Sequence, residues 1–177
     1  DSDDEWLPEK LMSQMSFVHS QPSLEFVFGN FRNVNLLSDK TTIAFDDVQG
    51  ALSKLLTSDE GNYNFLVHDK FLECIASENV IATDTVLMKR ELIDTLGGFD
   101  EQLRNGEDFE LWWRMGLAGK KLGYTTLLLL NRYKPSDSLS SPSIASLKSA
   151  IKTLDISSEN ARQADRSELI YFLNKPY

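Results

Sequence analysis

The sequence predicts an α/β fold in one domain, with helices and strands alternating along the chain. Apolar residues recur at helical spacing near the N-terminus and again after Glu107, whereas apolar runs typical of strands lie at 23–35 and 124–133. The length of 177 residues suits one ordinary domain with a buried core, since domains most often have roughly 100 to 150 residues. A hydrophobic fraction of 41% and a charged fraction of 25% exclude disordered and fibrous classes.

The first two elements are a helix and a strand. We expect a helix over 8–18, because Pro8 suits a first helical position and apolar residues follow it at spacings of three and four. Over 23–35, alternating Phe and Val residues predict a strand, or a hairpin broken at Gly29 and Asn30.

The alternation of helices and strands continues in the middle of the chain. We expect its last helix, over 89–96, to end at Gly97, because glycine tolerates the left-handed conformation at a helix C-terminus. In order, we expect a helix beginning at Asp46 or Asp47, a loop over 58–64, a helix over 65–76, a strand over 80–88 and a helix over 89–96.

The last third begins with a helix opened by Glu107 and Asp108 and closed by Gly119. A buried strand over 124–133 and a serine- and proline-rich loop over 134–142 follow. We then expect two helices capped by Ser143 and Ser158, the first with a core face of Ile144, Leu147, Ile151 and Leu154.

Charge and composition exclude several classes of function. A net charge of -9 disfavours a nucleic-acid partner and an anionic membrane surface, because both call for a surplus of Lys and Arg. The single cysteine, Cys74, forms no internal disulfide, and His19 and His68 lack the spacing of zinc ligands. The longest apolar run, 127–130, is far shorter than the roughly 20 residues of a spanning helix, so we expect a cytoplasmic protein, with a peripheral position on the inner face of the membrane as the alternative.

Three carboxylates, those of Asp1, Asp3 and Asp4, begin the chain. In an extended backbone Asp1 and Asp3 point to the same side, so they could share one divalent cation. Hard oxygen ligands suit Mg²⁺ or Mn²⁺, which bridge phosphate oxygens of nucleotides. The alternative is a solvated acidic terminus, since charge runs are usually exposed.

Glu107 and Asp108 are expected at a helix N-terminus, where unpaired backbone amides keep a carboxylate ionised. An ionised carboxylate there can act as a base. The alternative is that both acids only stabilise the helix dipole.

Trp112 and Trp113 are adjacent, about 100° apart around a helix, so we expect one of them to leave the core and line a cleft. An aromatic face there suits the apolar face of a sugar ring, and an interface position is an equal alternative. Arg114 is expected to pair with a neighbouring acid rather than with a phosphate.

Two segments together resemble family 2 glycosyltransferases of the GT-A type. The opening Asp-Ser-Asp-Asp-Glu-Trp-Leu-Pro-Glu-Lys-Leu resembles the family's metal-binding DxD motif and the helix after it. Residues 87–115, with Gly-Gly-Phe-Asp-Glu and Gly-Glu-Asp-Phe-Glu-Leu-Trp-Trp-Arg-Met, resemble its acceptor-side block. The resemblance implies a Rossmann-like mixed sheet flanked by helices, with a partial catalytic domain over 1–140 and a helical extension over 141–177.

The resemblance also implies an activity, the inverting transfer of a sugar from a nucleotide diphosphate donor to an acceptor hydroxyl in cell-envelope polysaccharide or glycoconjugate synthesis. A UDP-sugar is the expected donor. Asp1, Asp3 and Asp4 would hold Mn²⁺ or Mg²⁺ and the donor, with the role of each left open. Asp108 would be the catalytic base and Glu107 would orient its neighbours, while Trp112, Trp113 and Arg114 would lie on the acceptor side.

The family places a nucleotide-binding βαβ region before its DxD motif, and in this sequence nothing precedes Asp1. We therefore expect the N-terminal nucleotide-binding part to be missing, which would leave a sheet edge exposed. A second copy of the chain is one candidate for covering that edge.

Two other functions remain open. One is an inactive or incomplete fragment that acts as a binding module. The other is a haloacid-dehalogenase-like phosphatase, which shares an Asp-x-Asp motif but expects Thr or Val where Glu5 stands.

Overall fold

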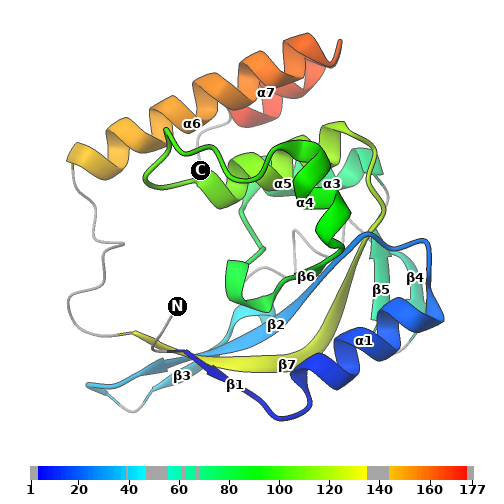
Figure 1. The fold of residues 1–177 in the computed structure, drawn as a ribbon. Helices are drawn as coiled ribbons and strands as arrows, with labels where there is room; N and C mark the ends of the chain where they lie inside the picture. Colours follow the sequence, from blue (N-terminus) through cyan, green and yellow to red (C-terminus); the bar gives the residue numbers. More distant parts are fainter. Residues whose placement is uncertain are drawn as a thin grey trace.

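The computed structural model describes residues 4–38, 40–46, 56–60, 63–66, 68–134 and 144–174. They form an α/β fold whose mixed sheet is flanked by helices (Figure 1). Its main path runs β3-β2-β7-β5-β4, with β1 paired to β7 and β6 paired to β2. The strands are β1 (Glu5–Trp6), β2 (Phe26–Asn35), β3 (Thr41–Ile43), β4 (Leu56–Glu60), β5 (Tyr63–Leu66), β6 (Leu87–Met88) and β7 (Leu122–Lys134).

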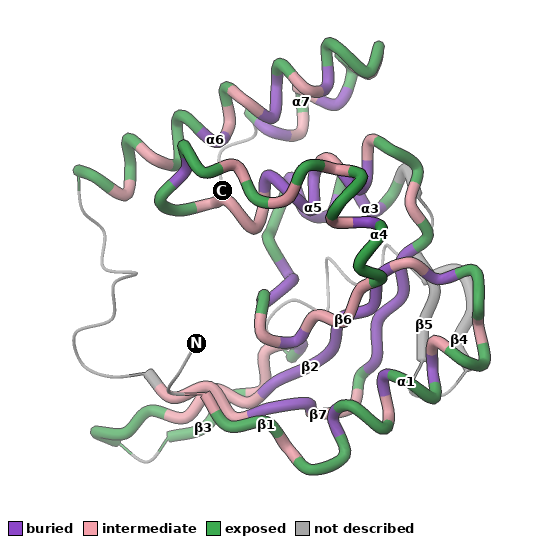
Figure 2. Tube along the Cα trace, viewed as in Figure 1, coloured by how far each residue is buried: buried purple, intermediate pink, exposed green. Residues whose placement is uncertain are grey.

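Strands β2 and β7 form the centre of the sheet and run parallel, while the other pairings are antiparallel. Both central strands are largely buried (Figure 2). The predicted break at Gly29 and Asn30 is wrong, because β2 passes through both residues with a shift in its pairing to β7. The Asn30 side chain accepts hydrogen bonds from the amides of Phe31 and Phe45, which satisfies the backbone at this irregularity.

The helices are α1 (Lys10–Ser20), α3 (His68–Ser77), α4 (Arg90–Leu96), α5 (Glu107–Leu117), α6 (Ile144–Gln163) and α7 (Ile170–Leu173), with short 3₁₀ turns η1 (Thr83–Thr85) and η2 (Ser167–Leu169). Because side chains alternate across a strand, Phe26 and Phe28 face α3 and α5, whereas Val27 packs with Phe17 of α1. Helices α6 and α7 form an outer layer over α5 and α3 (Figure 1).

Three predicted helices are confirmed with small shifts at their ends. The first is α1, and the second is α4, after which Gly97 takes φ +80°. The third is α5, which begins at Glu107 and is followed by Gly119 at φ +69°. The strand predicted over 124–133 is confirmed as β7.

The loop predicted over 58–64 is wrong, because β4 and β5 form an antiparallel pair there. The helix expected over 65–76 accordingly starts later, at His68. The strand expected over 80–88 is reduced to β6 after the turn η1. Most of the helix predicted from Asp46 or Asp47 and the loop predicted over 134–142 lie outside the described residues.

The C-terminal segment was predicted as two helices, but Ser158 lies inside the single helix α6. Ser143 is outside the described residues. The predicted core face is also wrong, because Ile144, Leu147 and Ile151 are 75%, 62% and 60% exposed. The buried face of α6 consists of small side chains instead, those of Thr153, Ser157, Ser158 and Ala161.

Candidate functional site

Asp4 lies just before β1 and is buried against the end of β7. The Tyr133 amide donates to Asp4 Oδ1 over 3.3 Å, and Arg132 Nε lies 4.0 Å from Asp4 Oδ2. The Asp4 side chain is only 3% exposed, so it is not part of a freely solvated terminus. Asp1 and Asp3 lie outside the described residues.

A second buried carboxylate, that of Asp84, lies beside Asp4. Arg132 Nη2 donates to Asp84 Oδ1 over 3.2 Å, and the Asp84 side chain is 6% exposed. Burial, and then the neighbouring Asp84 carboxyl group, raise the pKa of Asp4 above its ordinary value. Arg132 thus joins two acids from distant parts of the sequence.

Helix α1 holds the same region from the other side. Lys10 is buried, donates to Gln14 Oε1 over 2.8 Å and lies over the Trp6 ring. Gln14 in turn donates to the Thr85 carbonyl over 2.8 Å. Burial lowers the pKa of Lys10, and the negative charge of Asp84 opposes that shift.

Asp108 occupies the first turn of α5 and is half-buried. Its Oδ1 accepts from the Phe109 amide over 2.6 Å, and its Oδ2 accepts from Thr83 Oγ1 over 3.4 Å. The unpaired amides of this helix end point toward the N-terminal side of α5, where anionic groups interact favourably with the helix dipole. In the neighbouring Glu107, the buried Oε2 has no hydrogen-bond partner among the described residues.

Gly106 determines where α5 begins. It takes φ +82°, and a Cβ added there would lie 2.6 Å from Thr153 Oγ1 of α6. Both the backbone conformation and the close contact with α6 therefore require glycine. This contact sets the position of the Asp108 end of α5 against the outer helical layer.

The turn η1 connects the buried Asp4–Asp84 pair with Asp108 at the start of α5. Thr83 contacts Asp108, while the next residue, Asp84, contacts Arg132 and lies beside Asp4. The structure therefore brings Asp4 and the start of α5 next to consecutive residues of one short turn. Asp84 and Arg132 were not predicted as site residues, since neither belongs to a recognised motif.

The tryptophans do not line a cleft. Both Trp112 and Trp113 are 0% exposed, which corrects the expectation that one of them leaves the core. Trp112 packs on Phe26, and Trp113 Nε1 donates to the Ser157 carbonyl of α6 over 2.9 Å. Because α5 lies between the sheet and the outer helices, both sides of it are buried, and neither ring has a face open to an acceptor.

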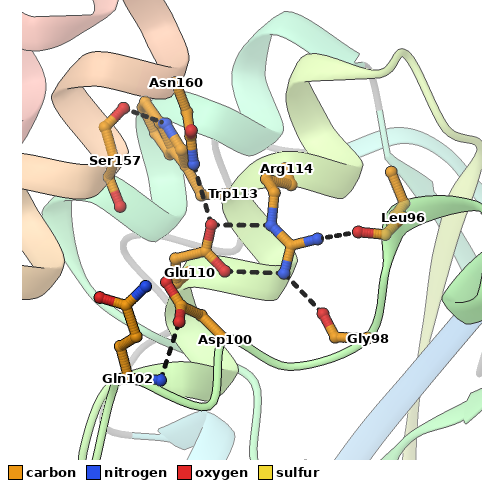
Figure 3. Close-up of polar contacts among 9 residues, drawn as sticks. All are labelled: Leu96, Gly98, Asp100, Gln102, Glu110, Trp113, Arg114, Ser157 and Asn160. Atoms are coloured by element: carbon orange, nitrogen blue, oxygen red, sulfur yellow. Dashed lines mark hydrogen bonds and ion pairs between the residues drawn. The ribbon is translucent and has the colours of Figure 1, made fainter.

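Arg114 pairs with an acid, as predicted. Its Nε and Nη2 donate to the two carboxylate oxygens of Glu110 over 2.7 and 2.8 Å, and it also binds the carbonyls of Leu96 and Gly98 (Figure 3). Asn160 of α6 donates to the same Glu110 carboxylate. These contacts hold α4, α5 and α6 together, so the role that the structure supports for Arg114 is structural.

Carboxylate oxygens suit Mg²⁺ or Mn²⁺, and Asp84 Oδ2 is buried without a hydrogen-bond partner among the described residues. Asp4 and Asp84 offer such oxygens, but Arg132 already pairs with both. Within the described residues no group of three or more His, Cys, Asp or Glu side chains could hold a metal ion. A cation site here therefore requires further ligands, for which Asp1 and Asp3 are the predicted candidates.

The described helices include none that is both long and apolar enough to cross a membrane. When the sequence is compared with known proteins, it matches no family model and no curated protein.

Proposed function

We propose that this chain carries the acceptor side and part of the donor side of an inverting glycosyltransferase site with a GT-A arrangement. The observation that carries the proposal is the turn η1. It connects the predicted base, Asp108, with the predicted donor segment at Asp4. A site for transfer needs both segments next to each other, because the acceptor oxygen must reach the sugar carbon attached to the donor phosphate.

Asp108 is the proposed general base. Its position at the N-terminus of α5 stabilises the negative charge, and Thr83 orients one of its oxygens. In the proposed step the carboxylate removes the proton from the acceptor hydroxyl while that oxygen attacks the anomeric carbon. The bond to the nucleoside diphosphate breaks on the opposite face, so the configuration at that carbon inverts.

The donor diphosphate is proposed to lie near Asp4 and Arg132. A bound Mn²⁺ or Mg²⁺, held by Asp1 and Asp3 with Asp4 close by, would neutralise negative charge on the phosphates. Asp4 and Asp84 together hold the Arg132 guanidinium, which is 30% exposed and can present its remaining donors to a phosphate.

A non-catalytic binding module is the second candidate. It is favoured by the ion pairs of Arg132 with both Asp4 and Asp84, which give these acids a structural role without any ligand. The two candidates differ in whether bound donor is turned over.

The test of the donor site is calorimetric titration of UDP into the chain with and without Mn²⁺. We expect UDP binding that requires the metal. Its affinity is expected to fall at least tenfold in Asp3→Ala, because the loss of a hard oxygen ligand lowers the affinity of the site for the cation. Asp94→Ala is the control, since Asp94 is an exposed acid on α4. Equal affinity in Asp3→Ala and Asp94→Ala would show that the predicted metal motif does not bind the donor.

A further inference from the structure

A polar pocket of about 270 Å³ lies where the loop after α4 meets α5 and α6. The loop contributes residues 97–100, α5 contributes Glu110 and Arg114, and α6 contributes Ile156 and Asn160. Figure 3 shows most of these side chains grouped around the Arg114 guanidinium. Three separate elements thus supply the lining.

This pocket lies on a different side of α5 from the proposed base. At 3.6 residues per turn, Glu110 and Arg114 are about 200° and 240° around the helix from Asp108, and Asp108 is not part of the lining. A ligand bound here does not occupy the position proposed for the acceptor hydroxyl. The pocket is therefore independent of the proposed function.

The Arg114 guanidinium has few hydrogen-bond donors left for a ligand. It donates twice to the Glu110 carboxylate, through Nε and Nη2. It also donates to the carbonyls of Leu96 and Gly98 (Figure 3). An arginine side chain has five N–H donors, so these contacts leave the pocket at most one, and an anionic ligand has little to bind.

Acceptor capacity, in contrast, remains in the lining. Asp100 Oδ1 accepts from the Gln102 amide over 2.9 Å, and no hydrogen bond from a described residue reaches Asp100 Oδ2. Asn160 Nδ2 donates to Glu110 Oε1 over 2.9 Å, which leaves the amide oxygen without a described donor. Glu110 Oε2 accepts only from Arg114 within the described part of the chain, and a carboxylate oxygen can accept twice. Three oxygens of the pocket can thus accept further hydrogen bonds.

The charge of the lining favours a cation. Asp100 and Glu110 against Arg114 give it a formal net charge of -1. Glu110 is 2% exposed, so its charge is screened less by salt than that of an exposed acid. Phe99 packs on Trp112 and is still 39% exposed, and an aromatic ring attracts a cation placed over its face.

These features together match a primary ammonium group. Such a group has one positive charge, three N–H donors and no acceptor, which correspond to the net charge and to the three oxygens. A quaternary ammonium would leave those oxygens unpaired, and Ca²⁺ takes roughly six to eight oxygen ligands. Phe99 and Ile156 can contact the carbon atoms next to the ammonium. Sites for drug-sized ligands have roughly 300 to 1,000 Å³, so the occupant is a small molecule.

We propose that this pocket is a second ligand site, which binds the ammonium group of a small primary amine. Alkylamines are protonated at neutral pH, since an amine such as that of lysine has an ordinary pKa of about 10.4. A bound amine would contact the loop after α4 together with α5 and α6, and would therefore stabilise the folded chain.

The test is calorimetric titration with butylamine hydrochloride, 1-butanol and tetramethylammonium chloride at equal ionic strength. We expect butylammonium to bind about tenfold or more tighter than the other two, because hydrogen bonds to charged groups are stronger than neutral ones. Butylammonium is also expected to raise the melting temperature, and KCl at the same concentration is not.

Conservative variants locate the binding. Asp100→Asn keeps an oxygen for the Gln102 amide but replaces the other carboxylate oxygen by an NH2 group, so butylammonium is expected to bind about tenfold or more weakly. Phe99→Leu is expected to weaken it severalfold. Glu101→Gln is the matched control, since Glu101 is the next acid, is exposed and lies outside the lining. Asp108→Asn is expected to bind butylammonium normally.

Equal affinities for butylammonium and butanol, or equal losses in Asp100→Asn and Glu101→Gln, would overturn the proposal. Tetramethylammonium that binds as tightly as butylammonium would show that charge alone is recognised, and would overturn the match to three N–H donors. Tighter binding of Nα-acetyl-lysine methylamide would assign the pocket to a lysine of another protein rather than to a small molecule. Butylammonium binding in a chain that transfers no sugar would overturn only the proposed function.

Discussion

Asp108→Asn is expected to lower the rate of sugar transfer by a factor on the order of a hundred or more while UDP binding is unchanged, because a general base contributes roughly 10²- to 10⁴-fold. Asparagine preserves the shape of the side chain: its amide oxygen can accept from the Phe109 amide, and its NH2 group can donate to Thr83 Oγ1. It loses the negative charge and the capacity to take a proton. The measurement is single-turnover transfer from a radiolabelled UDP-sugar, with saturating donor.

The control for this variant is Asp155→Asn, which changes an exposed acid on α6 and is expected to leave transfer intact. The folded state of both variants is compared by circular dichroism. Transfer by Asp108→Asn at the native rate would remove Asp108 from the mechanism. Loss of transfer together with loss of UDP binding would point to a structural role for the α5 N-terminus instead.

Arg114→Ala is expected to lower the free energy of unfolding by about 3–5 kcal/mol, because removing one partner of a buried ion pair leaves the other charge without compensation. Glu110 is 2% exposed and, among the described residues, would keep only the hydrogen bond from Asn160 (Figure 3). The carbonyls of Leu96 and Gly98 would also lose their donor. Urea denaturation monitored by tryptophan fluorescence measures the change.

The matched control is Arg90→Ala. Arg90 and Asp94 have the same i,i+4 spacing, but their side chains are 89% and 64% exposed. An exposed pair of this kind contributes roughly 0.3 to 0.5 kcal/mol, so this variant is expected to have nearly native stability. Similar losses in the two variants would show that the spacing of the charges, rather than their burial, determines the contribution.

Local signals predicted much of the helical structure. In α4 and α5, a glycine with positive φ marks the C-terminal end, and in α5 acidic residues mark the first turn. The β4 and β5 pair was missed because polar and glycine residues over 58–64 resemble a loop. Strands β4 and β5 form because β5 pairs with both β4 and β7, and the pairing with β7 is a long-range contact that a local pattern does not contain.

The buried face of α6 could not be predicted from apolar spacing. Isoleucine and leucine side chains form a regular stripe on this helix, yet the side facing α5 carries Thr153, Ser157 and Ala161. The reason is steric, because small side chains let α6 approach Gly106 and the Trp113 ring closely. The helical spacing of α6 was predicted correctly, but its core-facing side was predicted from hydrophobicity alone.

The residues of the candidate site also fall into two groups, those predicted from the sequence and those found only in the structure. Asp4 and Asp108 were predicted through motifs, and the structure connects them through η1. Asp84 and Arg132 were missed because their importance comes from their position in space. A buried strand that ends in Asn131, Arg132 and Tyr133 was one available signal, since a charged residue at the end of a central strand needs a partner.

Small residues form the contact between α5 and α6, and this contact determines which part of the molecule unfolds first. Hydroxyl and methyl groups bury little apolar area, so the buried face of α6 gains less from the hydrophobic effect than the aromatic core around Phe26, Phe28 and Trp112 does. Regions with few buried apolar contacts open at lower free energy than the rest of a protein. Detachment of α6, with the sheet, α3 and α5 still folded, is therefore the expected first opening, and it would uncover one side of Trp113.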